Sequence, residues 1–429
     1  MNFQKNGGFG PAPAESGSLS DAVRTLTPKL ARLWDDCQRG VPSWGRTFSP
    51  RDRAPREKAL ARFVRGVRDE AKRPPRTPPE VEAVRKRILT GFDRLAREAL
   101  GWEDRHLEAL LAGGFDRSAL EFTRTARRFD SGLGPSDIFQ AWRNVWVMNG
   151  LQMLLGLPVR VTPAVFAYSL LYPYTDNIID DPGTTEEDKQ AFNDRFKRRL
   201  EGRTTSAADP REQKIFDLVG MIEGQYDRPG FPQVYESLLA IHRAQVGSVL
   251  LLRAERSTSA ADVLSIVLEK GGTSVLADGC LVAGAVTPVQ AEFLFGLGAF
   301  LQLVDDLEDV DEDARDGLLT VFSQAAGREP LDSLTDRAVC FGSRIMDGLG
   351  GFAVPGSEPL QELMKSATLR VLISSAGQAP RHYGRPYLKT LETHSPFRFS
   401  FSSRQRRKLV RRRALLKRLF EASAGLSPV

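Results

Sequence analysis

Two groups of acidic residues occur at spacings that suit the binding of a cation. In the first group Asp176 and Asp180 stand four residues apart, and Asp181 follows directly. Residues at positions i and i+4 of a helix lie one turn apart on the same face, so both carboxylates can reach a common cation. Two like charges at this spacing destabilise a bare helix by roughly a few tenths of a kcal/mol. We therefore expect a cation to neutralise the pair.

The second group combines an amide side chain with carboxylates. Gln302, Asp305 and Asp309 follow a spacing of three and then four residues, and Asp306 adjoins Asp305. This spacing aligns the polar groups in one stripe of a helix whose other faces are apolar. Oxygen ligands without His or Cys favour a hard cation, and Mg²⁺ typically takes one or two carboxylates and keeps positions for water and substrate phosphate. The two groups together predict facing Mg²⁺ sites.

A solvated acidic helix end is the alternative interpretation of each group taken alone. An EF-hand is excluded for the residues from Asp309 onward, because Ala314 stands where that loop needs glycine and Thr320 where it needs its last glutamate. Two such groups on separate, strongly apolar helices favour the metal-site interpretation.

Long segments with helical spacing of apolar residues position both groups. Because the sequence shows no sustained alternation of the kind typical of strands, we expect an all-α bundle of about ten or more helices. Thr184 and Glu187 form the pattern of a capping box at the start of the helix after the first acidic group. The main expected helical segments are 136–155, 162–180, 186–200, 231–256, 261–285, 289–310 and 360–375.

The chain divides by composition into four parts. Residues 1–20 are rich in Gly, Pro, Ser and Asn and are expected to form a disordered lead. Residues 21–135 are expected to form a basic helical region with Pro- and Arg-rich breaks. Residues 136–395 hold both acidic groups and form the expected catalytic domain, and residues 396–429 form a basic tail helix.

The formal net charge of +6 is unevenly distributed along the 429 residues. Residues 1–100 carry a net +9 and residues 404–429 a net +8, whereas residues 101–403 carry a net −11. The tail segment 404–418 could make a peripheral contact with an anionic membrane. Alternatively, it packs on the body of the protein with its arginines against the acidic middle. Nucleic acid is the poorer candidate partner, because base-reading motifs and interleaved aromatic residues are missing.

Cysteine and histidine usage narrows the chemistry and the compartment. The three cysteines, Cys37, Cys280 and Cys340, lie far apart and form no CxxC metal motif, which fits a reducing, cytoplasmic setting. The four histidines form no HExxH pattern, which disfavours zinc hydrolysis. The sequence has no run of about 18 apolar residues and no signal peptide at its start. We expect a cytoplasmic protein, with membrane association left open.

The segment Phe300–Asp309, FLQLVDDLED, resembles the second aspartate-rich motif of the class I isoprenoid synthase superfamily. This superfamily includes trans-prenyl diphosphate synthases, squalene and phytoene synthases, and class I terpene synthases. Residues 269–273, EKGGT, resemble the lysine-containing start of the helix that contacts diphosphate in those enzymes. The first acidic group has the DxxxD form of squalene and phytoene synthases and not the DDxxD of chain-elongating enzymes. The resemblance covers about residues 231–320, with weaker support over 162–200.

The resemblance implies an isoprenoid-synthase-like bundle around a central apolar cavity, with both acidic groups at its mouth. It implies an enzyme, a transferase or lyase, that uses two or three Mg²⁺ ions to ionise a prenyl diphosphate substrate. The allylic cation then condenses or cyclises, and pyrophosphate is released. The implied catalytic metal ligands are Asp176, Asp180, Asp305 and Asp309, with Asp181, Asp306 and Gln302 as further ligands. Lys270, Arg243 and Arg253 are the candidate diphosphate contacts, and Leu171, Tyr172 and Tyr174 are the candidate cavity residues.

Two other functions stay open at this point. A head-to-head synthase of the squalene or phytoene type is suggested by the DxxxD form of the first group. A non-catalytic protein of the same fold, bound to anionic membrane through its basic tail, is suggested by segment 404–418. Ordinary surface or core roles remain the alternative for Lys270, for both arginines and for the aromatic residues. Whether the chain forms a homodimer also stays open.

Overall fold

The computed structural model describes residues 18–37, 43–179, 181, 183–249, 251 and 258–426. Every regular element within these ranges is helical, so the expected all-α class is confirmed, with 19 α-helices. The helices are α1 Leu19–Asp36, α2 Pro50–Ala71, α3 Pro78–Leu95, α4 Asp104–Ala112, α5 Phe115–Phe129, α6 Pro135–Leu154, α7 Pro163–Ile179, α8 Glu186–Leu200, α9 Pro210–Gln225, α10 Pro232–Ser248, α12 Ala260–Ala283, α13 Pro288–Glu308, α14 Val310–Asp316, α15 Val321–Ala325, α16 Asp332–Asp347, α17 Glu358–Gln378, α18 Arg385–Thr393, α19 Phe399–Val410 and α20 Arg413–Leu426.

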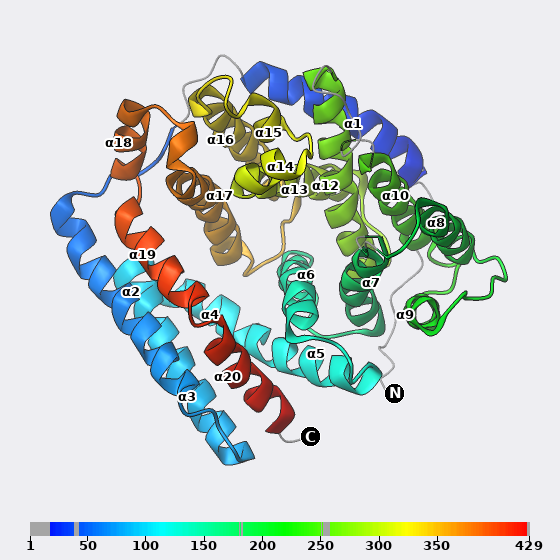
Figure 1. Cartoon of the computed structure of the whole chain (residues 1–429), viewed down its shortest axis with the longest axis horizontal. Helices are drawn as coiled ribbons and strands as arrows, with labels where there is room; N and C mark the ends of the chain where they lie inside the picture. Colours follow the sequence, from blue (N-terminus) through cyan, green and yellow to red (C-terminus); the bar gives the residue numbers. More distant parts are fainter. Residues whose placement is uncertain are drawn as a thin grey trace.

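Helices α12 and α13 form the centre of the bundle (Figure 1). Both are apolar around most of their circumference, which is typical of helices that are buried on several sides. They cross where Gly271 of α12 meets Gly298 of α13, and a Cβ atom on either glycine would collide with the backbone of the other. Glycine at both positions therefore allows the two backbones to touch.

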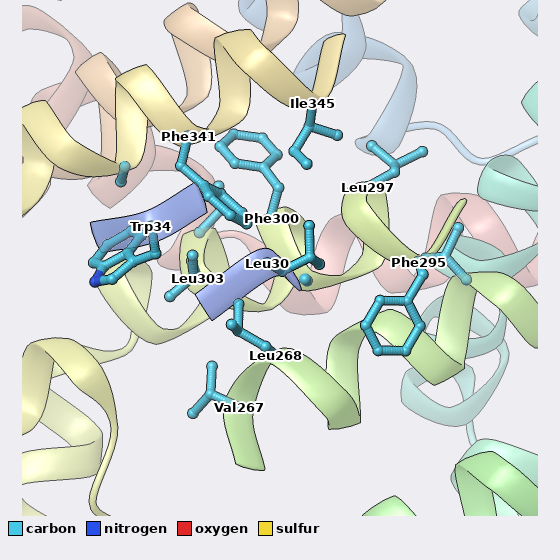
Figure 2. Packing of buried hydrophobic residues seen from close by; sticks show 14 of the residues in the cluster. Leu30, Trp34, Val267, Leu268, Phe295, Leu297, Phe300, Leu303, Phe341 and Ile345 are labelled. Atoms are coloured by element: carbon cyan, nitrogen blue, oxygen red, sulfur yellow. The ribbon is translucent and has the colours of Figure 1, made fainter. Parts of the chain in front are cut away.

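The larger hydrophobic core lies on one side of this central pair. Helix α1 packs against α12, α13 and α16, and Figure 2 shows Leu30 and Trp34 of α1 among the side chains of those helices. The Trp34 ring meets the edge of Phe341 on α16, with ring centroids 5.8 Å apart. The first described helix thus belongs to the core of the bundle rather than to a separate N-terminal region.

A second hydrophobic core lies on the other side and joins α5, α6, α7, α9 and α10 to α12. Phe166 of α7 is fully buried between Phe122 and Phe129 of α5. Tyr226, directly after α9, donates a hydrogen bond to the Leu281 carbonyl oxygen of α12, at 3.0 Å. Helix α7, which carries the first acidic group, is therefore packed against several neighbouring helices, among them α6, α9 and α12.

The two basic ends of the chain lie side by side. Helices α2 and α3 form a hairpin, and α19 and α20 pack along it (Figure 1). A small apolar cluster holds them, in which Leu419 of α20 contacts Ala71 and Val84. Arg398, just before α19, forms an ion pair with the buried Glu57 of α2. The tail, expected as one helix, is two helices, which pack on the other basic region and also contact α5, α6 and α17 of the middle of the chain.

Several expected boundaries agree with the structure and one cap is wrong. Helix α8 spans the expected 186–200, and α6, α12 and α13 begin and end within two residues of the expected positions. The cap of α8 is Thr185, whose hydroxyl accepts a hydrogen bond from the Asp188 amide at 3.1 Å, and not Thr184 with Glu187. Among the described helices, none combines the length and hydropathy that crossing a bilayer requires.

The crossing of α12 and α13 predicts that a methyl group added to a glycine lowers the stability of the protein at the crossing but not at a glycine with free space around it. We expect Gly271→Ala to lower the free energy of unfolding by about 1–3 kcal/mol, because the new Cβ collides with α13. The matched control is Gly150→Ala in α6, where a Cβ meets nothing within 4 Å. This control should gain about 0.5–1 kcal/mol. Urea denaturation measures both, and equal effects would contradict the proposed crossing.

Candidate functional site

A cavity of about 440 Å³ opens between α6, α7, α10, α12, α13 and α17. Its wall is mainly apolar and includes Leu171, Leu238, Ile241, Val275 and Val304. Pockets of roughly 300–1,000 Å³ with few polar groups are typical of small-molecule sites. The polar residues of the wall are Gln140, Arg143, Asn144, Tyr168, Tyr172, Thr175, His242, Gln245, Lys270, Ser274, Asp278, Gln302, Asp305 and Glu308.

Helix α6 links the two acidic groups beside the end of this cavity that Arg143 and Asp305 line, which we call its mouth. Asp176 contacts a lining residue but is not itself among the lining residues. The Gln140 side-chain amide donates to an Asp176 carboxylate oxygen at 3.4 Å. One turn further along α6, Arg143 Nη2 lies 3.2 Å from Asp305 Oδ1 on α13. The pKa of Tyr172 is raised by burial and then by the nearby charges of Asp176 and Asp305. One tyrosine hydroxyl is therefore close enough to respond to both acidic groups.

The adjacent residues Asp305 and Asp306 face in different directions. Asp305 lies in the cavity wall beside Arg143, whereas Asp306 is 4% exposed and accepts a hydrogen bond from Gln302 at 2.8 Å. The second oxygen of Asp306 has no hydrogen-bond partner among the described residues. Burial raises the pKa of Asp306 to about 8, against the opposing effect of Gln302. Gln302, which lines the cavity, thus holds Asp306 away from the side of α13 that faces the cavity.

Further carboxyl groups gather at the end of α13. Burial and the neighbouring Asp305 raise the pKa of Asp309. Asp313, on α14, has its pKa raised to about 7 by burial and by the charge of Asp309. Lys270 lowers the pKa of both Asp306 and Asp313, which places its charge near them. The end of α13 thus brings several carboxyl groups with raised pKa values near one lysine of α12.

Several of the residues singled out from the sequence do not face the cavity. Arg243 is exposed and donates to the Ser20 hydroxyl at 3.3 Å, because Leu238, Ile241 and Gln245 occupy the cavity face of α10 instead. Tyr174 donates to Asp130 at 2.5 Å on the opposite side of α7. Asp180 and Arg253 lie outside the described residues.

The third residue of the first acidic group, Asp181, is bound by its local surroundings. It accepts a hydrogen bond from the Gly183 amide at 2.9 Å and pairs with Arg211 at 3.4 Å. These contacts lower the pKa of Asp181, with the Gly183 amide as the largest cause. Of the candidate cavity residues, Leu171 and Tyr172 line the wall, together with the candidate ligands Gln302 and Asp305 and with Lys270.

Sequence reasoning missed the polar residues of α6. Arg143 and Asn144 follow Gln140 by three and four residues, on a helix that is otherwise largely apolar. This spacing is the same signal that singled out Gln302 and Asp305, so it could have identified α6 as a third polar stripe. The signal was weaker because α6 offers no carboxylate at these positions.

The carboxylates at the mouth fit a hard cation that keeps water or phosphate ligands. Among the described residues, no three His, Cys, Asp or Glu side chains converge on a point that could hold a metal ion by themselves. Mg²⁺ commonly binds through one or two carboxylates and completes its shell with water and substrate phosphate. Part of the rise in the pKa of Asp309 comes from the charge of Asp305, so a positive charge beside these two carboxyl groups would oppose that part of the rise.

Comparison with known proteins provides no relative from which a role could be transferred. No protein-family model, curated protein or solved structure matches the chain.

The buried histidine of the cavity wall predicts a pH-dependent stability. Burial lowers the pKa of His242 to about 4, whereas an unfolded histidine titrates near about 6.5. The folded protein keeps a neutral imidazole while the unfolded chain takes up a proton, so stability is lost as the pH falls below about 6.5. Between pH 7 and pH 5 we expect the wild type to lose about 2 kcal/mol more unfolding free energy than His242→Gln.

Urea denaturation at the two pH values measures this difference. The control is His394→Gln, a histidine near the surface that binds the Gly45 carbonyl oxygen. This control should follow the wild type. A His242→Gln protein that loses as much stability as the wild type between the two pH values would show that His242 is not held neutral.

Proposed function

We propose that the protein is a Mg²⁺-dependent isoprenoid synthase that ionises a prenyl diphosphate and then condenses or cyclises the allylic cation, releasing pyrophosphate. One observation carries the proposal. Asp305 of α13 lines the cavity, and two further lining residues, Gln140 and Arg143 of α6, contact Asp176 of α7 and Asp305 respectively. A charged mouth above a largely apolar interior suits an amphiphile with an anionic head and a hydrocarbon tail.

The head of such a substrate would bind at the mouth. Among the described residues of the cavity wall, Lys270 and Arg143 are the cationic side chains, and they supply direct contacts for a diphosphate. Asp176, Asp305 and Asp309 would hold Mg²⁺, which when bound neutralises the diphosphate and stabilises it as a leaving group. Arg143 now pairs with Asp305, so we expect it to exchange this carboxylate for phosphate oxygens when the substrate binds.

The tail would occupy the apolar part of the cavity. Leu171, Leu238, Ile241 and Val275 exclude water from the allylic carbon after the carbon–oxygen bond breaks. A cation in this environment reacts with a second substrate or with its own double bonds before water can capture it. The depth of the apolar wall would then limit the length of the chain that is accepted.

The decisive experiment is a pyrophosphate-release assay with purified protein, Mg²⁺ and diphosphates of geranyl, farnesyl and geranylgeranyl chains. We expect Asp176→Asn and Asp305→Asn to lower kcat/KM by at least about 100-fold, as expected when stabilisation of a leaving group is lost. Asp181→Asn is the matched control, because Asp181 binds Gly183 and Arg211. It should retain activity close to that of the wild type.

Two results would contradict the proposal. One is the absence of pyrophosphate release and of binding with every diphosphate tested. The other is full activity in both Asp176→Asn and Asp305→Asn. Mass spectrometry of the products separates the reaction types, since a longer linear diphosphate indicates condensation, a cyclic hydrocarbon indicates cyclisation, and a symmetric hydrocarbon indicates head-to-head coupling.

A further inference from the structure

The interior of the cavity contains a carboxyl group that the proposed reaction does not use. Asp278 of α12 lines the cavity and is only 1% exposed. Its Oδ1 atom has no hydrogen-bond partner among the described residues. The one side-chain hydrogen bond that affects its pKa comes from Asn144 of α6. Asp278 is therefore half satisfied in a mainly apolar environment.

The position of Asp278 along α12 determines how far it lies from the mouth of the cavity. Lys270, Ser274 and Asp278 follow one another at intervals of four residues and all line the cavity. At a rise of about 1.5 Å per residue, Asp278 lies about 12 Å along the helix from Lys270. Tyr168 is close by, because the charge of Asp278 contributes to raising the pKa of that tyrosine. Asn144, Tyr168, Ser274 and Asp278 thus form a polar patch well below the mouth.

An unsatisfied polar group costs stability. Burying a polar group without a partner typically costs about 1–3 kcal/mol, and an apolar side chain of similar size would avoid this cost. Buried polar atoms in folded proteins normally have a partner, so an orphaned one that faces a cavity points to a group that occupies the cavity. A hydrocarbon chain alone offers no such group.

We propose that Asp278 binds an oxygen-bearing group in the tail of the ligand, so that the preferred ligand is an oxygenated isoprenoid diphosphate. This inference rests on the proposed function, which places the diphosphate near Lys270 and the tail toward Asp278. The separation of about 12 Å along α12 places the oxygen near the third isoprene unit. The chemistry fits a hydroxyl group, which can both donate and accept a hydrogen bond.

The protonation state of Asp278 agrees with this role. Burial raises its pKa well above the ordinary value for aspartate, which favours the neutral acid over the carboxylate. A neutral carboxyl group donates through its O–H and accepts through its other oxygen, so it can satisfy both functions of a ligand hydroxyl. Binding would then supply the partner that Oδ1 lacks.

The test compares two unreactive ligands in the presence of Mg²⁺, the thiolodiphosphate of farnesol and the same molecule with a hydroxyl on its third isoprene unit. Isothermal titration calorimetry gives the two dissociation constants. We expect the wild type to bind the hydroxylated ligand at least about 10-fold more tightly, because only that ligand satisfies Asp278. Asp278→Leu should reverse this preference, and Asp278→Asn should keep part of it.

Glu308→Gln is the matched control, since Glu308 is a carboxylate of the same cavity that accepts a hydrogen bond from Ser375. It should leave the ratio of the two dissociation constants unchanged. Thermal unfolding shows whether Asp278→Leu folds, and we expect a higher Tm than that of the wild type. A wild type that prefers the plain ligand, or shows no preference, overturns the inference and leaves water as the partner of Asp278. If neither ligand binds, the proposed function fails as well.

A separate observation concerns two cysteines. The Sγ atoms of Cys37 and Cys340 lie 2.7 Å apart, although the residues are 303 positions apart in sequence. Cys37 caps the C-terminal end of α1, and Cys340 lies on α16. Arg337, one turn before Cys340, also holds the end of α1 through the Trp34 carbonyl oxygen at 2.6 Å. The two sulfur atoms are therefore held together by the packing of α1 on α16.

We also infer that Cys37 and Cys340 are a site of disulfide formation, with a low-molecular-weight disulfide such as oxidised glutathione as the oxidant. The more accessible Cys340 thiolate attacks the glutathione disulfide and releases one glutathione thiolate. Cys37 then displaces the second glutathione, its thiol proton passing to the solvent, and the protein disulfide forms. Two protein thiols are oxidised while one glutathione disulfide is reduced to two glutathiones. Burial raises the pKa of Cys37 to about 12, so we expect the second step to be slower.

Incubation of the full chain with oxidised glutathione, followed by peptide mass spectrometry without reduction, tests this inference. We expect a Cys37–Cys340 cross-linked peptide in the wild type and in Cys280→Ser, and none in Cys340→Ser. Because the cross-link closes a very long loop, the Tm of the oxidised wild type should rise by roughly 5 °C or more. A stable glutathione adduct on Cys340, or the absence of any cross-link, would overturn the inference.

Discussion

The contact between Gly271 and Gly298 is the constraint on which the rest of the structure depends. Because neither residue has a side chain, the backbones of α12 and α13 touch at this point. The contact fixes Lys270 next to the Gln302 turn of α13 and aligns the two cavity-facing stripes. Helices α1, α6, α10, α16 and α17 then pack around this pair. A wider crossing would separate the lysine from the carboxyl groups whose pKa values it lowers.

The charged regions are arranged in space differently from their order along the chain. Asp305 and Glu308 line the cavity, where Arg143 and Lys270 are the cationic side chains among the described residues of the wall. The basic ends form a separate layer, since α2 and α3 pack with α19 and α20. This layer also touches the main bundle, because Phe420 of α20 meets the edge of Trp142 on α6, with centroids 4.7 Å apart. The negative and positive regions thus stay apart while sharing α6.

Local patterns predicted much of the helical structure and part of the candidate site. The helical spacing of apolar residues predicted both ends of α8, α12 and α13 to within two residues, because that spacing is contained in the sequence of each helix itself. Asp305 lies on the face that its spacing predicts, whereas Arg243 takes the surface role that was kept as its alternative: it shares α10 with cavity residues and yet points toward Ser20. Arg143 could not be paired with Asp305 from the sequence, since 162 positions separate them. Only the packing of α6 against its neighbours brings that pair together.

The place of α1 in the core has a consequence for how the chain folds during synthesis. Leu30 and Trp34 are buried against α12, α13 and α16, so the first described helix requires partners that lie more than 200 residues later in the sequence. At roughly 5–20 residues per second, a ribosome needs about 15–60 s to reach Phe341 after it has made Trp34. Helices α10, α12 and α13 become available as partners of α1 earlier in this interval, and α16 becomes available last. Helix α1 is thus made long before the helices that bury its apolar face.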